Sequence, residues 1–245
     1  MADPTVSLVT SGTSATASTQ ISFTSVAAGT LLVLTVAADD YKTGDPSGWT
    51  LSTGCAQQGY AGHYLWWKIA SGSETSVTYV IGSATVSTYH LLSATNIEGT
   101  GSLDISNGQS QQLPDVTAYA TPSVTTSSGR RLAVASLCAM NASQTSTMAS
   151  WTNSYTERGD TCTTSGSFDN LGSATLVLDG GGSTSTQSTV SYGSLWQGGI
   201  IAVFKVAAES GVTATAVSAT STVQNYATAG VDIVIGGTSR QGIWT

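Results

Sequence analysis

The side chains that could bind a metal ion or transfer a proton are few and widely spaced. The two histidines, His63 and His90, lie in or beside different predicted strands, with no obvious carboxylate partner. A zinc site needs three or four ligands, so we interpret both histidines as ordinary strand residues. The Gly-x-Ser-x-Gly, His-Glu-x-x-His and glycine-rich phosphate-binding motifs of common enzymes do not occur in the sequence.

Acidic residues gather in two predicted loops. Asp39, Asp40 and Asp45 follow an apolar strand, and such an oxygen-rich loop can hold Ca²⁺, although a solvated turn is the favoured interpretation. Glu157 and Asp160 lie in the corresponding loop of the second half. A glycosidase needs two carboxyl groups about 5–10 Å apart in a cleft, and no insertion that would build a cleft is visible. We therefore predict no catalytic residues, no metal site and no required cofactor.

Aromatic residues are the remaining candidates for a binding surface. Exposed tryptophan and tyrosine side chains on a β-sheet can stack on sugars, whereas the alternative places the tryptophans in the core. Because Trp66 and Trp67 are adjacent, they face opposite sides of a regular strand, one toward the core and the other toward solvent or a partner. The candidates for glycan or partner contacts are Tyr41, Tyr60, Tyr64, Trp66, Trp196 and Trp244.

The composition favours strands and disfavours several classes of partner. Charged residues make up 9% of the 245 residues, against about 25% in an average soluble domain. The net charge of −7 disfavours nucleic acid and anionic membranes, which attract clustered Lys and Arg. The N-terminus resembles no signal peptide, and no apolar run approaches the roughly 20 residues of a membrane helix. We expect folding in the cytoplasm of the host cell.

Short apolar segments alternate with turn-forming Gly, Ser, Thr and Asp throughout the chain, which is typical of an all-β protein. The number of strands predicts a two-layer antiparallel β-sandwich with jelly-roll-like connections. The predicted strands lie near residues 6–9, 19–23, 31–37, 64–68, 77–81, 88–93, 132–139, 174–178, 189–192, 199–207 and 232–235.

Two halves of the sandwich share an order of short motifs. Each begins with Gly and an apolar strand, continues with a Trp-Thr element, Gly48-Trp49-Thr50 or Ser150-Trp151-Thr152, and contains Ser-Val-Thr-Tyr or its near-copy Thr-Val-Ser-Tyr. This order predicts an internal pseudo-repeat over residues 29–95 and 129–207 within a sandwich of residues 1–207. Residues 208–245 are predicted to form an extended C-terminal arm, which Trp244 anchors on its own chain or on a neighbour.

Three cysteines, Cys55, Cys138 and Cys162, have no metal-like spacing. Cys138 lies in an apolar run and is predicted to be buried. Cys55 and Cys162 each follow a Trp-Thr element, so a disulfide between them is one possibility, although nothing else in the sequence indicates an oxidising compartment.

One pattern in the first half resembles a known group of proteins. It consists of Gly48-Trp49-Thr50-Leu51, then Leu65-Trp66-Trp67-Lys68-Ile69-Ala70-Ser71-Gly72-Ser73-Glu74, then Val77-Thr78-Tyr79. This pattern, within residues 29–95, resembles phage and prophage structural proteins with jelly-roll-like domains. The resemblance implies a non-enzymatic virion protein, either a capsid decoration, cement or head-fibre protein or a tail protein, whose partners are its own copies and other virion proteins. A glycan-binding module or host-recognition adhesin is the alternative.

Overall fold

The computed structural model describes residues 2–57, 61–82, 86–111, 116–142, 147–163, 168–194, 196–208, 232–235 and 238–241. All paired strands among these residues are antiparallel, and the secondary structure of these residues includes no helix, so none of them belongs to a helix that could cross a membrane. The prediction of an all-β sandwich is therefore confirmed.

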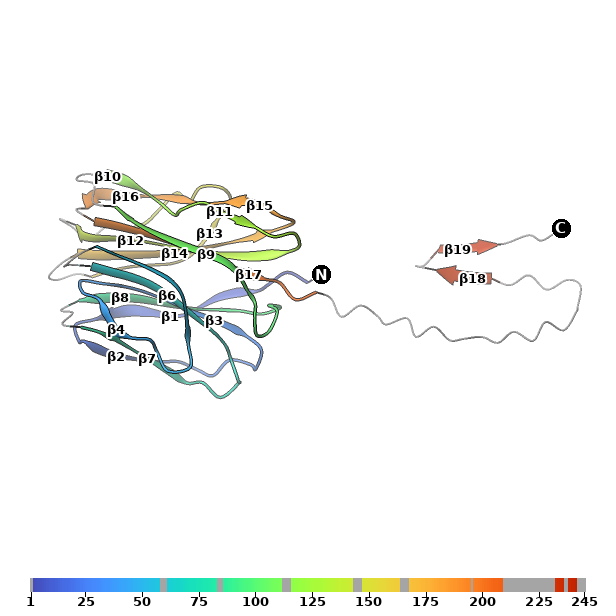
Figure 1. Cartoon of the computed structure of the whole chain (residues 1–245), viewed down its shortest axis with the longest axis horizontal. Helices are drawn as coiled ribbons and strands as arrows, with labels where there is room; N and C mark the ends of the chain where they lie inside the picture. The colour runs from blue at the N-terminus through green and yellow to red at the C-terminus, as the bar shows by residue number, and fades with distance from the viewer. Residues whose placement is uncertain are drawn as a thin grey trace, which may run out of the picture. The chain divides into compact units, whose positions relative to one another are not determined.

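Two five-stranded antiparallel sheets form the centre of the molecule (Figure 1). The first sheet comprises, in spatial order, β1 (Val6–Ser14), β8 (Ser87–Ala94), β3 (Leu31–Ala38), β6 (Ala61–Ile69) and β5 (Thr50–Gln57). The second comprises β9 (Leu103–Gln111), β17 (Trp196–Lys205), β12 (Arg131–Ala142), β14 (Phe168–Leu178) and β13 (Thr156–Cys162).

The two sheets have equivalent strand orders. When the strands of each half are numbered along the chain, β1, β8, β3, β6 and β5 correspond to β9, β17, β12, β14 and β13. Local conformation repeats as well, because Gly29 (φ 82°) and Gly129 (φ 101°) shortly precede the two central strands in a left-handed conformation. The residues before the two Trp-Thr elements, Gly48 (φ 75°) and Ser150 (φ 59°), share that conformation. The repeated motifs therefore have repeated backbone geometry.

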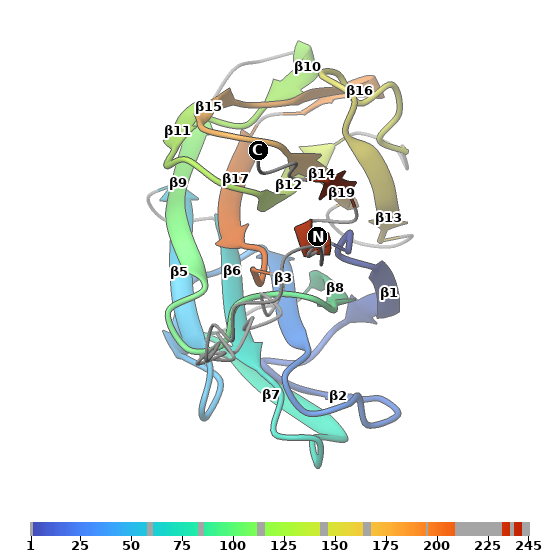
Figure 2. The ribbon, with the colours of Figure 1, turned by 90° about the vertical axis from the view of Figure 1, so that its right-hand side faces the viewer.

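The two five-stranded sheets pack face to face around a shared core. On each central strand, alternate side chains point to this core, since the side-chain period of a strand is two. Edge strands of the two sheets also lie side by side, as Figure 2 shows for β5 and β9, and Ser106 Oγ donates to the Ser52 carbonyl across them (2.9 Å). The shared apolar core includes Leu31, Val33, Leu65, Leu92, Leu132, Val134, Ile200, Ala202 and Phe204.

The outer face of each five-stranded sheet is also covered, which adds layers to the predicted two. A sheet of β2 (Ser18–Ser22), β7 (Ser76–Ile81) and β4 (Lys42–Gly44) covers the first sheet. The pairs β10 (Val116–Ala120) with β16 (Gln187–Ser194), and β11 (Val124–Thr126) with β15 (Gly182–Thr184), cover the second (Figure 1). Because both faces are buried, β3 reads as a continuous apolar run, with all eight residues buried.

All four edge strands of the two central sheets are irregular. Bulges of this kind twist an edge away from regular pairing and are a recurrent protection against edge-to-edge association. The register shifts lie at Leu8/Thr10 in β1, Leu51/Thr53 in β5, Glu157/Gly159 in β13, and Leu103/Ile105 in β9 opposite Phe204/Val203.

The turn after β6 is shaped by a glycine and by a nearby carboxylate. Gly72 adopts a left-handed conformation (φ 94°), which glycine tolerates at little cost. Lys68 Nζ lies 2.7 Å from a carboxylate oxygen of Glu74, and the same carboxylate accepts hydrogen bonds from the amides of Ser71 and Gly72 (3.0 and 3.1 Å). Although desolvation opposes it, these hydrogen bonds hold the pKa of Glu74 below its usual value. The turn is therefore closed by a glycine in a left-handed conformation and by the ion pair of Lys68 with Glu74.

The chain divides into two units, Met1–Glu209 and Ser210–Thr245. Within the C-terminal unit, β18 (Asp232–Ile235) pairs antiparallel with β19 (Thr238–Gln241). The first of these strands matches the sequence prediction and the second is additional. Trp244 lies outside the described residues, so its anchoring role stays a prediction.

Candidate functional site

Polar side chains meet between the two five-stranded sheets, beyond the apolar part of their shared core. We call this cluster the polar seam; it comprises Thr35, His63 and His90 from the first sheet and Ser136, Thr161 and Ser173 from the second. All of these except the half-buried Thr161 are fully buried. Strand alternation places them there, because Thr35 shares its face with Leu31 and Val33 of the same strand.

His63 links the two halves of the protein. Its Nε2 lies 2.9 Å from Ser136 Oγ on β12, and its Nδ1 lies 3.9 Å from the thiol of Cys55 on the neighbouring strand. A methyl group added at Gly198 would lie about 3 Å from the sulfurs of Cys55 and Cys138 and from His63 Nδ1. The absence of a side chain at Gly198 therefore makes room for the two thiols and the imidazole.

His90 is held by two hydroxyls of the second sheet. Its Nδ1 lies 2.8 Å from Ser173 Oγ and its Nε2 lies 3.0 Å from Thr161 Oγ1. Ser173 Oγ is also 3.4 Å from Thr35 Oγ1. Among the described residues, the two imidazoles therefore bond to hydroxyl groups of the opposite half. The contact of His63 with Cys55 is the exception, because it lies within the first half.

The seam is suited to holding the halves together rather than to chemistry on a ligand. Burial lowers the pKa of His63 to about 3, with a smaller contribution from His90, and burial lowers the pKa of His90 to about 4. Both imidazoles are therefore neutral near pH 7. A serine beside a histidine can act as an activated nucleophile, but Ser136, Ser173 and both histidines have no exposed surface. The sequence interpretation of the histidines as strand residues agrees with this geometry.

The first group of candidate carboxylates is engaged in local contacts. Asp45 Oδ1 accepts from Lys42 Nζ (2.7 Å) and from Trp66 Nε1 (2.8 Å), and these bonds lower the pKa of Asp45. Asp39 and Asp40 accept from backbone amides, those of Val86 (3.2 Å) and Tyr41. Among the described residues, no three His, Cys, Asp or Glu side chains are placed to hold a metal ion. Calcium binding by Asp39, Asp40 and Asp45 has no support in this geometry.

Glu157 and Asp160 occupy the edge strand β13, whereas the sequence predicted a loop. Asp160 Oδ2 accepts from the Met148 amide (2.8 Å), while its Oδ1 is buried without a hydrogen-bond partner in the described structure. Burial raises the pKa of Asp160 to about 6, with a contribution from the charge of Glu157. Strand β13 is polar because it is an edge, and this polarity misled the sequence interpretation.

Two of the candidate contact aromatics are core residues. Trp66 is 0% exposed and packs between the first sheet and its covering layer, and Trp196 is 2% exposed in the shared core. Their proposed contacts with a glycan or partner are therefore wrong. Trp67, the neighbour of Trp66, faces the other side of the strand; it is half-buried and packs against Phe204 (ring centroids 5.8 Å apart). Tyr41 is half-buried and keeps some exposed surface.

Tyr64, a further candidate, is also a core residue. Tyr64 is 5% exposed, and its hydroxyl accepts from the Lys42 amide (3.0 Å). Tyr60 and Trp244 lie outside the described residues, so their roles stay predictions.

The three cysteines form no disulfide with one another in the structure. Cys55 and Cys138 are buried, as predicted for Cys138, and Cys162 is half-buried. Burial raises the pKa of Cys55 to about 12, so its thiol is protonated and inert. The alternative of a disulfide between Cys55 and Cys162 does not occur in this structure.

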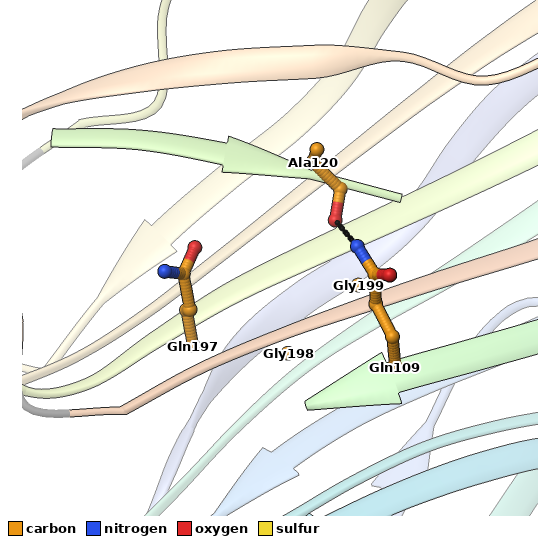
Figure 3. Close-up of a pocket in the computed structure, with 5 residues that line it drawn as sticks. All are labelled: Gln109, Ala120, Gln197, Gly198 and Gly199. Atoms are coloured by element: carbon orange, nitrogen blue, oxygen red, sulfur yellow. Dashed lines mark hydrogen bonds between the residues drawn. The ribbon is translucent and has the colours of Figure 1, made fainter. Parts of the chain in front are cut away.

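A small pocket beside the seam accommodates no more than a water-sized group. It measures about 10 Å³ and is bounded by Gln109, Ala120 and Gln197 together with Gly198 and Gly199 (Figure 3). The Gln109 amide donates to the Ala120 carbonyl (2.9 Å) across its mouth.

Comparison with protein-family models, with curated proteins and with solved structures finds no match to this chain.

Proposed function

We propose that this chain is a non-enzymatic structural protein of a phage virion, located on the capsid surface as a decoration, cement or head-fibre protein, or on the tail. It acts by packing against its own copies and other virion proteins. The sequence pattern from Gly48 to Tyr79 carries the proposal, because it resembles virion structural proteins. The charge of −7 and a surface rich in Ser and Thr support packing without burial of many charges.

The structural roles of the pattern support this reading. Trp49 and Trp66 pack under the covering sheet, Gly72 forms the turn, and Lys68 pairs with Glu74. Each of these residues contributes to the packing of the fold or to one of its turns. The pattern therefore consists of residues that build the fold. Proteins that share a structural role would be expected to share residues of this kind.

Contacts with neighbouring subunits are expected to use side chains and loops. Bulges interrupt all four edges of the central sheets, where a strand of a neighbouring subunit could otherwise add. A bulged edge offers few consecutive backbone groups in register. Hydroxyl-bearing faces and the C-terminal segment are accordingly the surfaces that we assign to assembly.

The first test is the native mass of the full chain by light scattering on a sizing column. A stable trimer or larger ring is expected for a virion component. Immunogold labelling of purified phage particles from the producing strain then distinguishes head from tail. Particles that carry no label, and contain none of the chain by mass spectrometry, would contradict the proposal.

A further inference from the structure

The outer face of the second five-stranded sheet carries a groove of about 360 Å³, close to the size of small-ligand sites. It lies beside the β11–β15 pair. Leu176 and Leu178 of β14 contribute its apolar surface. Polar groups of Ser123, Asn153, Thr184 and Ser185 surround them.

The chemistry of the lining selects for a neutral, hydroxyl-rich ligand. No charged side chain lines the groove, so it offers nothing to neutralise a phosphate, a carboxylate or a metal ion. Within the described residues, the hydroxyls of Ser123 and Ser185 make no hydrogen bond to protein and are available as donors and acceptors. A sugar ring combines an apolar C–H face, which suits the leucines, with hydroxyls that suit these groups.

The loop that supplies Asn153 is held in an unusual conformation. Ser150, Asn153 and Ser154 have left-handed φ values of 59°, 56° and 62°, and they are three of the four such non-glycine residues in the described structure. Asn153 Nδ2 donates to the Ser185 carbonyl (2.8 Å), which fixes the side-chain amide beside the groove. Clusters of this kind cost folding energy and often mark functional sites.

The equivalent position in the first half is occupied by an ion pair. Leu176 pairs with Ala133 of the central strand β12, and Lys68 pairs with Leu32 of the central strand β3. The two pairs occupy equivalent positions in the two sheets, so Lys68 is the counterpart of Leu176. Lys68 is paired with Glu74 there. The second half therefore has an uncharged groove where the first half has an ion pair. Packing of the repeated fold does not by itself require this difference.

We propose that this groove binds a neutral sugar unit of a glycan. Leu176 and Leu178 pack against the ring, and Asn153, Ser123 and Ser185 bond its hydroxyls. The inference goes beyond the assembly role and does not depend on where in a virion the protein lies.

The test is a screen of the full chain against an array of neutral and acidic glycans, followed by titration of the best neutral mono- or disaccharide by NMR. Asn153→Ala should weaken binding about tenfold, because one polar contact and the loop geometry are lost. Ser185→Trp should abolish binding by filling the groove. Both variants should keep the wild-type circular dichroism spectrum.

Asn96→Ala is the matched control. Asn96 is also exposed, has φ 58°, and donates through its amide to a backbone carbonyl, that of Asp3 (3.0 Å), but it lies in the first half. This variant should bind like wild type. The proposal is overturned if wild type binds no neutral glycan, if Asn153→Ala and Ser185→Trp both bind unchanged, or if Asn96→Ala loses binding equally.

Discussion

Acidification from about pH 7 to about pH 5 should destabilise the protein through His63 and His90. Both imidazoles are buried and neutral in the polar seam, and hydroxyl groups are their principal partners. A proton on either ring places a charge between the two sheets, where no carboxylate of the described seam faces it. Unfolding exposes the rings to water, where they accept protons freely.

The size of the effect follows from the pKa values. Each histidine has a pKa of 6.5 when unfolded and about 3 or 4 when folded. Between these values only the unfolded chain binds the proton, so stability is complete above pH 6.5 and falls as the pH falls. Between about pH 7 and about pH 5, proton binding to the two histidines in the unfolded chain lowers the free energy of unfolding by about 4 kcal/mol. Asp160 acts in the opposite direction, because its pKa is raised from 3.8 to about 6 and the folded chain therefore binds this proton more readily than the unfolded chain. Its contribution raises the free energy of unfolding by roughly 1 kcal/mol at about pH 5, a figure reduced for screening by solvent.

The assay is urea unfolding of wild type, His63→Gln, His90→Gln and the double variant at about pH 7, 6 and 5. Each histidine contributes about 2 kcal/mol and the net drop is about 3 kcal/mol, so each single variant should lose about two thirds of the acid-induced drop in unfolding free energy, whatever its stability at neutral pH. Glu74 and Asp104, whose pKa values are lowered, titrate on unfolding near 4.5 and 3.8 and contribute little in this interval. A double variant with the full wild-type pH dependence would refute the reasoning.

Three further predictions concern single residues. Ser150→Gly should raise the unfolding free energy by up to about 1 kcal/mol, because glycine accepts the left-handed conformation; a lower thermal midpoint would contradict this. Gly199→Ala should lower the unfolding free energy by about 1–3 kcal/mol, since the added methyl group would overlap the Ala120 carbonyl oxygen; a thermal midpoint equal to that of wild type would show that the backbone yields freely. A thiol reagent followed by peptide mass analysis should modify Cys162 in the folded protein and Cys55 only after unfolding, and equal rates at the two sites would disprove the burial of Cys55.

The buried strands were predictable because their sequences are apolar. The run Leu31–Ala38 and the alternation of Val77, Tyr79 and Ile81 each identified a strand correctly. The polar edges were not predictable by the same signal. Thr50–Gln57 and Thr156–Cys162 contain few apolar residues, since an edge strand has one exposed side and need not alternate.

The seam and the groove depend on information that spacing along the chain does not contain. His63 and Ser136 meet because two sheets pack with one relative position, which no local pattern specifies. Trp66 looked available for contacts because its sequence cannot reveal that a second, smaller sheet covers that face. The groove arises from Asn153 and Leu176, which are unremarkable singly and adjacent only after folding.

The place of β17 in the second sheet has a consequence during synthesis. It is the last strand of that sheet along the chain, yet it lies in the sheet interior between β12 and β9. The first sheet can close once Ala94 has left the ribosome, whereas the second stays divided until Lys205 emerges. At about 5–20 residues per second this interval lasts on the order of 10 s, with Leu65 and Leu92 facing water. We therefore expect the nascent first half to need protection by chaperones, and slow translation of the second half to lower the yield of soluble protein.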